Sequence, residues 1–331
     1  MTPLEGEYRN TVNRVASALL VFEGLFLLLG AVMAVVPLLT ESLSLRAQDV
    51  IYEMVYGILY AAVFTVPVLF FGWISSGKPR APIYLARKLP RETPLYIFAG
   101  IAVITAAAYV NSFLVSIFDY TAFSSEVIWG QDVSANYQLI LTFFTMAVVP
   151  AFVEELLFRG VILSNLLPYG RTTAVFASAI LFGVMHQNAE QLFYATAAGL
   201  VLGFIYVKTE SIWTCVLLHF VNNFTSVLQT VFYERLPIDT ANLVVGVMQF
   251  LIFGAGLLSA VLLLLRQRDT RAAIFETGCF EKDLPADPEY AQVEIPLRRR
   301  VRLFFSVPMI VFFAVCLLQM LSLVLMAVLL Y

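Results

Sequence analysis

The sequence predicts an all-α membrane protein, a polytopic transmembrane bundle of about nine helices with a range of eight to ten. Hydrophobic residues make up 60% of the chain and charged residues only 13%, whereas a typical soluble domain has about 45–50% and about 25%. The apolar residues also gather into long runs, and about 20 such residues cross a bilayer as a helix. Since a water-soluble core could not bury so much apolar surface, lipid must cover part of it.

Nine apolar runs account for the predicted spans. They are 16–40, 50–74, 95–118, 139–167, 173–186, 192–207, 212–232, 243–265 and 303–330. The fourth is long and contains Pro150, which should kink its helix because proline lacks the backbone N–H. The fifth is short. The whole chain, 1–331, is therefore predicted to form one transmembrane domain.

Basic residues are distributed unevenly between the two sides that these spans define. If the N-terminus is cytoplasmic, all but three of the 20 lysines and arginines fall in segments on the inner side. The exceptions are Arg46 and Arg235 outside, and Arg159 within a span. This asymmetry predicts an N-in, C-out protein, which we assign to a bacterial cytoplasmic membrane. The polar segment 267–302 is then a cytoplasmic loop before the last helix.

Charge and cysteine content exclude several other classes of protein. The net charge of −3 and the absence of a basic stripe give no sign of nucleic-acid binding. Cys215, Cys279 and Cys316 are far apart in the chain. They lack the paired spacing of a disulfide framework or a thiolate metal cluster. Membrane lipids are thus expected partners, and nucleic acid is not.

Three ionisable residues interrupt the fourth span, within the segment AFVEELLFRG at 151–160. Each such group costs roughly 2.5–3.5 kcal/mol at the centre of a membrane helix, so some arrangement must offset them. Glu155 and Arg159 are four residues apart and can pair on one helix face. Glu154 points about 100° away and has no partner in its own helix. A carboxylate held in this way could activate water as a general base.

The only two histidines, His186 and His219, both follow the glutamates and lie in predicted spans. Four-residue spacing aligns Phe182 with His186 and His219 with Asn223. Glu154, His186 and His219 could hold a zinc-bound water, since three ligands and an open position are typical of catalytic zinc. Equally, Glu154 and His186 could activate water without a metal, with His219 and Asn223 donating to an oxyanion.

Ideal straight helices would place these candidates at different depths in the membrane. Glu154 would lie roughly 20 Å, and His219 roughly 12 Å, from the inner ends of their spans. His186 would lie at the far end of the short fifth span. A kink at Pro150, an early end to the fourth membrane helix or a tilted fifth helix could bring them together.

Small residues recur at four-residue spacing in the sixth span, at Ala195, Gly199 and Gly203. Such a stripe lets helices approach closely. We therefore expect these residues to pack the helices of the catalytic core, 139–232, and not to take part in chemistry.

Three motifs in this order resemble those of the CPBP family, the CAAX-protease and bacteriocin-processing family, also called Abi or Rce1-like intramembrane proteases. They are Glu154-Glu155-x-x-x-Arg159, Phe182-x-x-x-His186 and His219-x-x-x-Asn223. The resemblance implies an all-helical intramembrane endopeptidase, described in the family both as a metalloprotease and as a glutamate protease. In some relatives the reaction removes the C-terminal tripeptide of a prenylated protein.

The resemblance also implies a role for each matched residue. The implied roles are water activation for Glu154 and His186, oxyanion stabilisation for His219 and Asn223, support of the first motif for Glu155 and Arg159, and packing beside His186 for Phe182. A zinc ion is an implied cofactor, and a peptide or lipidated protein is the implied substrate.

Two other functions stay open from the sequence. A proton- or ion-coupled transporter could use the polar residues of the spans in a relay. These are Glu23, Glu53, Glu154, Glu155, His186 and Asn223. The protease interpretation gives Glu23 and Glu53 no role beyond a polar contact between the first two helices or a lateral opening. The other alternative is a catalytically silent membrane scaffold or immunity protein.

Overall fold

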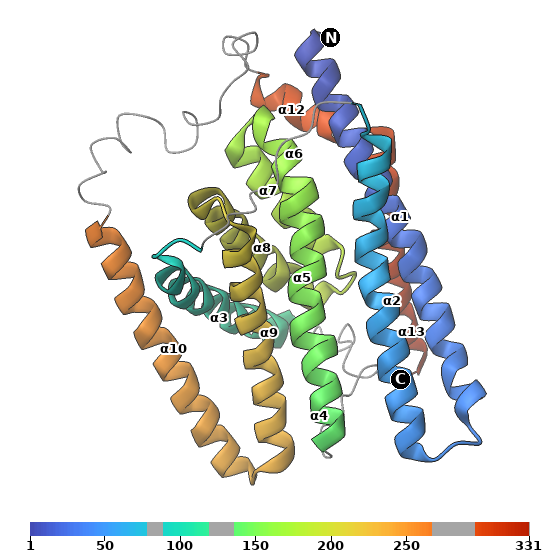
Figure 1. Cartoon of the computed structure of the whole chain (residues 1–331), viewed down its shortest axis with the longest axis vertical. Coiled ribbons are helices and arrows are strands. Elements are labelled where there is room, and N and C mark those ends of the chain that lie inside the picture. Colours follow the sequence, from blue (N-terminus) through green and yellow to red (C-terminus); the bar gives the residue numbers. More distant parts are fainter. Residues whose placement is uncertain (78–88, 119–135, 267–294, 331) are drawn as a thin grey trace.

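The computed structural model describes residues 1–77, 89–118, 136–266 and 295–330, and every element assigned there is a helix. Seven of these helices are long and apolar enough to cross a membrane. An eighth is counted if α12 (Leu297–Phe304) and α13 (Val307–Leu330), which are bent by 65°, form one span. The helices form one bundle, with α3 lying across the others (Figure 1). The all-α polytopic fold is therefore confirmed.

Six of the spanning helices are continuous α-helices. They are α1 (Pro3–Thr40), α2 (Leu45–Ile74), α3 (Thr93–Phe118), α8 (Ala189–Thr209), α9 (Ile212–Arg235) and α10 (Ile238–Arg266). Local sequence sets where several of them begin. Thr2 and Glu5 form a reciprocal capping box at the start of α1, and the Ser44 hydroxyl caps α2.

The fourth span, Asn136–Tyr169, alternates between α-helical and π-helical turns. Its pieces are α4 (Asn136–Thr142), η3 (Phe143–Val148), α5 (Val149–Glu155), η4 (Leu156–Leu163), α6 (Ser164–Leu166) and the 3-10 turn η5 (Leu167–Tyr169). Pro150 lies in the first turn of α5, where proline is tolerated. The chain thus passes Pro150 as one span, with π-helical turns on both sides of α5. Such turns are frequent at functional sites.

The fifth predicted span differs from the expectation. Helix α7 (Arg171–Val184) has 14 residues and rises only about 21 Å, less than the ~30 Å hydrocarbon core. His186 lies beyond its end, in a turn before α8. The Asn188 side chain closes this turn, because it accepts the Glu190 N–H at 2.9 Å and caps α8. The prediction that a membrane helix continues through 173–186 is therefore wrong at its end.

The small residues of α8 pack against α7, as predicted. A Cβ added at Gly199 would lie 2.9 Å from the Ala179 Cα, and one at Gly203 would lie 3.1 Å from the Val175 Cγ1. Ala195 is buried on the same helix. This close approach fixes α7, and the turn that follows it, against α8.

Three segments predicted to share one side of the membrane meet at one end of the bundle. Arg299 of α12 pairs with Glu5 near the N-terminus at 2.7 Å. Arg300 donates to the carbonyl oxygen of Tyr169, where the fourth span ends, at 2.8 Å. Their grouping agrees with the predicted topology, while the assignment of this side as cytoplasmic stays a prediction. Of the predicted loop before the last helix, residues 267–294 lie outside the described residues.

We expect the Gly199→Ala variant to lower the melting temperature in detergent. Alanine favours a helix by about 1 kcal/mol over glycine, but its Cβ would meet the α7 backbone, and overpacking costs about 1–3 kcal/mol. Gly254→Ala in α10 is the matched control, because nothing lies within 4 Å of a Cβ there. Equal melting temperatures for the two variants would contradict close α7–α8 packing.

Candidate active site

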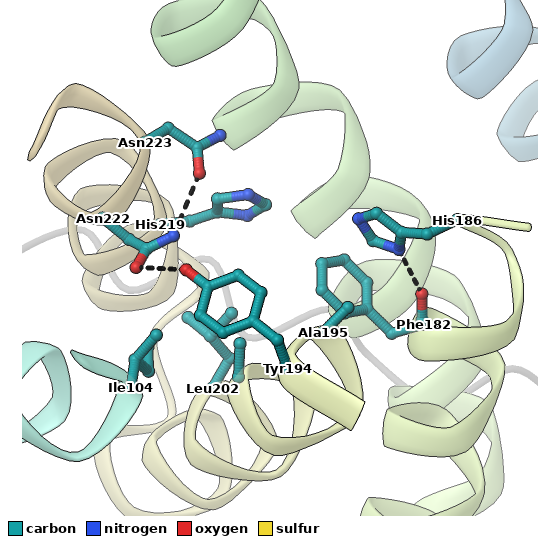
Figure 2. Close-up of a pocket in the computed structure, with 10 residues that line it drawn as sticks. Ile104, Phe182, His186, Tyr194, Ala195, Leu202, His219, Asn222 and Asn223 are labelled. Carbon is teal, nitrogen blue, oxygen red and sulfur yellow. Dashed lines mark hydrogen bonds between the residues drawn. The ribbon is translucent and has the colours of Figure 1, made fainter. Parts of the chain in front are cut away.

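The predicted site residues come together inside the bundle from three elements. Glu154 and Glu155 end α5, His186 lies on the turn after α7, and His219 and Asn223 lie on α9. A cavity of about 50 Å³ lies beside the two histidines (Figure 2). It is lined by Ile104, Phe182, His186, Tyr194, Ala195, Ala198, Leu202, His219, Asn222 and Asn223. The mismatch in depth expected for ideal straight helices is not present, since His219 Nε2 lies 3.9 Å from Glu154 Oε2 and both histidines line one pocket.

Glu155 and Arg159 form the predicted pair in the fully buried interior. The Arg159 Nη1 donates to the Glu155 Oε1 at 2.9 Å, and both side chains have 0% exposure. Arg159 Nη2 donates to the backbone carbonyl of Gly199 at 3.1 Å. The guanidinium also lies 4.8 Å from the centroid of the Phe182 ring, a cation–π contact. Arg159 thereby joins the fourth span to both α7 and α8.

Glu155 has a second partner that the sequence did not indicate. The His219 Nδ1 lies 2.8 Å from the same Glu155 Oε1. Because an ionised carboxylate can only accept, Nδ1 carries the proton of this hydrogen bond. The His219 Nε2 then faces the other glutamate, 3.9 Å from the Glu154 Oε2. Glu155 thus orients His219 as well as neutralising Arg159.

Glu154 is held by a tyrosine from a distant part of the chain. The Tyr60 hydroxyl of α2 donates to the Glu154 Oε1 at 2.5 Å. The Glu154 side chain is buried, and its Oε2 has no hydrogen-bond partner among the described residues. Sequence spacing could not reveal a contact between residues 94 apart. One carboxylate oxygen is therefore fixed by Tyr60, and the other lies beside His219.

His186 is oriented by the last turn of α7. Its Nδ1 lies 2.7 Å from the Phe182 carbonyl oxygen. Since a carbonyl can only accept, Nδ1 donates and Nε2 carries a lone pair in the neutral ring. The Phe182 ring lies at an edge angle to both imidazoles, with centroids 5.0 Å from His186 and 5.9 Å from His219. Figure 2 shows the His186 ring pointing its second nitrogen toward the pocket.

The asparagines of α9 form a chain of hydrogen bonds along one wall of the pocket. The Tyr194 hydroxyl donates to the Asn222 Oδ1 at 2.9 Å, and the Asn222 Nδ2 donates to the Asn223 Oδ1 at 3.1 Å. The Asn223 Nδ2 donates to the Met146 carbonyl oxygen in η3 at 3.0 Å. This chain fixes the Asn223 amide with its nitrogen as donor. Tyr194 was not expected at the site from the sequence.

Glu53, for which the sequence suggested no firm role, links α2 to the start of the fourth span. It accepts a hydrogen bond from the Thr145 hydroxyl at 3.1 Å. One turn away, Asp49 accepts from the Tyr137 hydroxyl at 2.9 Å. The contact is thus made with η3, and not between the first two helices as expected.

The side chains expected to hold zinc are not drawn together around one metal position in this arrangement. Among the described residues, no three His, Cys, Asp or Glu side chains are grouped so that they could hold a metal ion. We therefore derive no step through a metal at Glu154, His186 and His219, and zinc dependence stays a prediction.

Comparison with known proteins matches the segment that carries the site. The family model for a type II CAAX prenyl endopeptidase, Rce1-like, matches residues 136–225. The chain is also 31% identical over 93 residues to "Putative membrane peptidase YdiL" of Bacillus subtilis (strain 168). That alignment covers 27% of this chain and 37% of the relative. No solved structure matches.

Removing the Glu155 carboxylate should destabilise the protein strongly, because it leaves the Arg159 charge buried without a partner. We expect Glu155→Ala to lower the unfolding free energy by about 3–5 kcal/mol, as found for broken buried ion pairs. The double variant Glu155→Ala/Arg159→Met should recover part of this loss, since it removes the stranded charge. Thermal unfolding in detergent measures both, and an unchanged melting temperature in Glu155→Ala would contradict the pairing.

Proposed function

We propose that the chain is an intramembrane endopeptidase, because residues 136–225 match the Rce1-like model of a type II CAAX prenyl endopeptidase. The observation that carries the proposal is the difference in hydrogen bonding between the two carboxylate oxygens of Glu154. Its Oε1 is fixed by Tyr60, while its buried Oε2 lies 3.9 Å from His219 Nε2 and accepts no hydrogen bond from a described residue. Such a carboxylate is poised to take a proton from water.

In the proposed reaction, Glu154 and His186 activate a water molecule. The Glu154 carboxylate accepts a proton as the water oxygen attacks the carbonyl carbon of the scissile peptide bond. The second hydrogen stays on the water oxygen, and the His186 Nε2 accepts a hydrogen bond from it, which orients the oxygen lone pair toward the carbonyl carbon. Glu154 then returns the proton to the leaving amine as the carbon–nitrogen bond breaks. The products are a new carboxyl terminus and a new amine.

The oxyanion that forms during the attack needs hydrogen-bond donors, and α9 offers two. One is the His219 ring, whose Nε2 faces Glu154 and can donate to the oxyanion when it carries a hydrogen. The Asn223 amide supplies a second N–H. Donors placed before the reaction in a site without bulk water are worth several kcal/mol to the transition state.

The surroundings of the site suit a substrate that reaches it within the membrane. Ile104, Ala195, Ala198 and Leu202 give the pocket an apolar floor. A cavity of about 50 Å³ has room for water molecules and not for a peptide, so substrate binding must move the walls. We propose a peptide or lipidated protein as the substrate, with CAAX-type C-terminal processing as the reaction to test first.

The decisive experiment measures peptide cleavage by the purified protein in detergent. We expect cleavage of a farnesylated peptide, with an unmodified peptide as comparison. Glu154→Ala and His186→Ala should each lose roughly 10²–10⁴-fold in kcat/KM. Glu41→Ala, on an exposed position beyond α1, is the control that should stay active.

Each other outcome has a clear meaning. Cleavage that persists in Glu154→Ala and His186→Ala would refute the site assignment. Loss of cleavage on adding a chelator, restored by zinc, would establish the metalloprotease mechanism. Proton-coupled uptake into liposomes without any cleavage would favour a transporter, and neither activity would favour a scaffold.

Tyr60 should contribute to turnover more than to substrate binding, because it fixes Glu154, the proposed general base. We expect Tyr60→Phe, which removes only the hydroxyl, to lower kcat by roughly tenfold with little change in KM. Tyr109→Phe tests the loss of a hydroxyl at an exposed position of α3 and should leave kcat unchanged. A kcat in Tyr60→Phe equal to that of the wild type would show that the hydrogen bond does not matter for the reaction.

A further inference from the structure

The turn that carries His186 has an unusual backbone. Gln187, the next residue, has a φ of 53°, in the left-handed region that non-glycine residues rarely adopt. Two backbone hydrogen bonds to the end of α7 hold the turn, from His186 N to Gly183 O at 3.2 Å and from Gln187 N to Val184 O at 3.0 Å. A conformation of this kind persists only where the surroundings enforce it.

The surroundings that enforce it come from the first helix. The Gln187 side chain is buried, and its Nε2 donates to the Glu23 Oε2 of α1 at 2.7 Å. The two residues are 164 positions apart. Gln187 follows His186 directly in the chain. A change in the backbone at Gln187 would therefore also move the His186 imidazole.

The last helix completes the same contact. The Cys316 Sγ of α13 donates to the other Glu23 oxygen, Oε1, at 3.1 Å. Glu23 has 2% and Cys316 0% exposure. The carboxylate is thus held between the His186 turn and α13, and both of its oxygens have protein donors. Neither α1 nor α13 lies in the segment 136–225 that matches the protease family.

Joining helices through a buried carboxylate is energetically unfavourable compared with apolar packing. An ionisable group inside a membrane bundle costs roughly 2.5–3.5 kcal/mol on insertion scales, and an apolar side chain would pack α1 against α13 without that penalty. What Glu23 supplies, and a leucine would not, is a directional acceptor for the Gln187 amide.

Resting on the proposed function, we propose that Glu23 is a positioning residue for the active site. Through Gln187 it holds the turn in the conformation that aims His186 at the water beside Glu154, and Cys316 fixes the Glu23 carboxylate in turn. Misplacing a catalytic group by about 1 Å can cost 10²-fold in rate. Loss of the tether should therefore reduce kcat while substrate binding changes little.

Steady-state kinetics with a double-mutant cycle tests the tether. Glu23→Ala and Gln187→Ala should each lower kcat by roughly 10- to 100-fold, with KM within about twofold. The double variant should lose no more than either single one, because both remove the same contact. Glu23→Gln should keep most of the activity, since its amide oxygen can still accept from Gln187.

Glu5→Ala is the matched control. Glu5 is also a buried carboxylate of α1, and it also bonds to a C-terminal helix, through Arg299 of α12. It lies 18 residues before Glu23, about 27 Å along the helix. If kcat falls equally in Glu5→Ala, or in proportion to the unfolded fraction, the role of Glu23 is only structural.

A readout without turnover separates this inference from the proposed function. The chain has only two histidines, so protein labelled at histidine gives two imidazole NMR signals, assigned with His186→Ala. Glu23→Ala should shift the His186 signal and leave that of His219 in place. An unmoved His186 signal overturns the tether even if the protein is a protease. A shifted signal in a protein that cleaves no peptide supports the tether and rejects the protease.

Discussion

The Glu155 carboxylate is the interaction on which the rest of the site depends. Its Oε1 accepts from both the Arg159 guanidinium and the His219 imidazole, at 2.9 and 2.8 Å. In an apolar bundle each of these groups would be costly alone, and together they offset one another's desolvation. The same atom therefore stabilises the fourth span and fixes the ring of His219. Because Glu155 is the residue that pairs with Arg159 and His219, the neighbouring Glu154 keeps one carboxylate oxygen without a hydrogen-bond partner among the described residues.

The sequence predicted the features that depend on residues close together in one helix. Composition and apolar runs predicted the bundle, and four-residue spacing predicted the pair of Glu155 with Arg159. It could not predict where α7 ends, because the uncapped apolar run continues to His186. A signal lay in Asn188, a favoured N-cap residue two positions after His186, since α8 begins at the next residue, Ala189. That boundary moves the histidine from a helix to a turn.

Contacts between distant parts of the chain could not be predicted from spacing. Tyr60 reaches Glu154 across 94 residues and Gln187 reaches Glu23 across 164. Tyr60 and Glu23 come from helices outside the segment that matches the protease family. The three motifs therefore indicate which chemistry to expect, while α1 and α2 add contacts to the site that the motifs do not contain. A relative that keeps the motifs but replaces these helices would have to position its residues in another way.

The arrangement reconciles two opposed demands on polar groups in a membrane. Stability requires that buried polar atoms be bonded, and each of the central residues has such a bond: Glu154 to Tyr60, His186 to a backbone carbonyl, and His219 to Glu155. Reactivity requires that some atoms be left for water and substrate. In each of these side chains one polar atom meets the first demand while the second is directed to the interior. Under the proposed function, one site thus combines bonded atoms that stabilise the bundle with further polar atoms that can meet water and substrate.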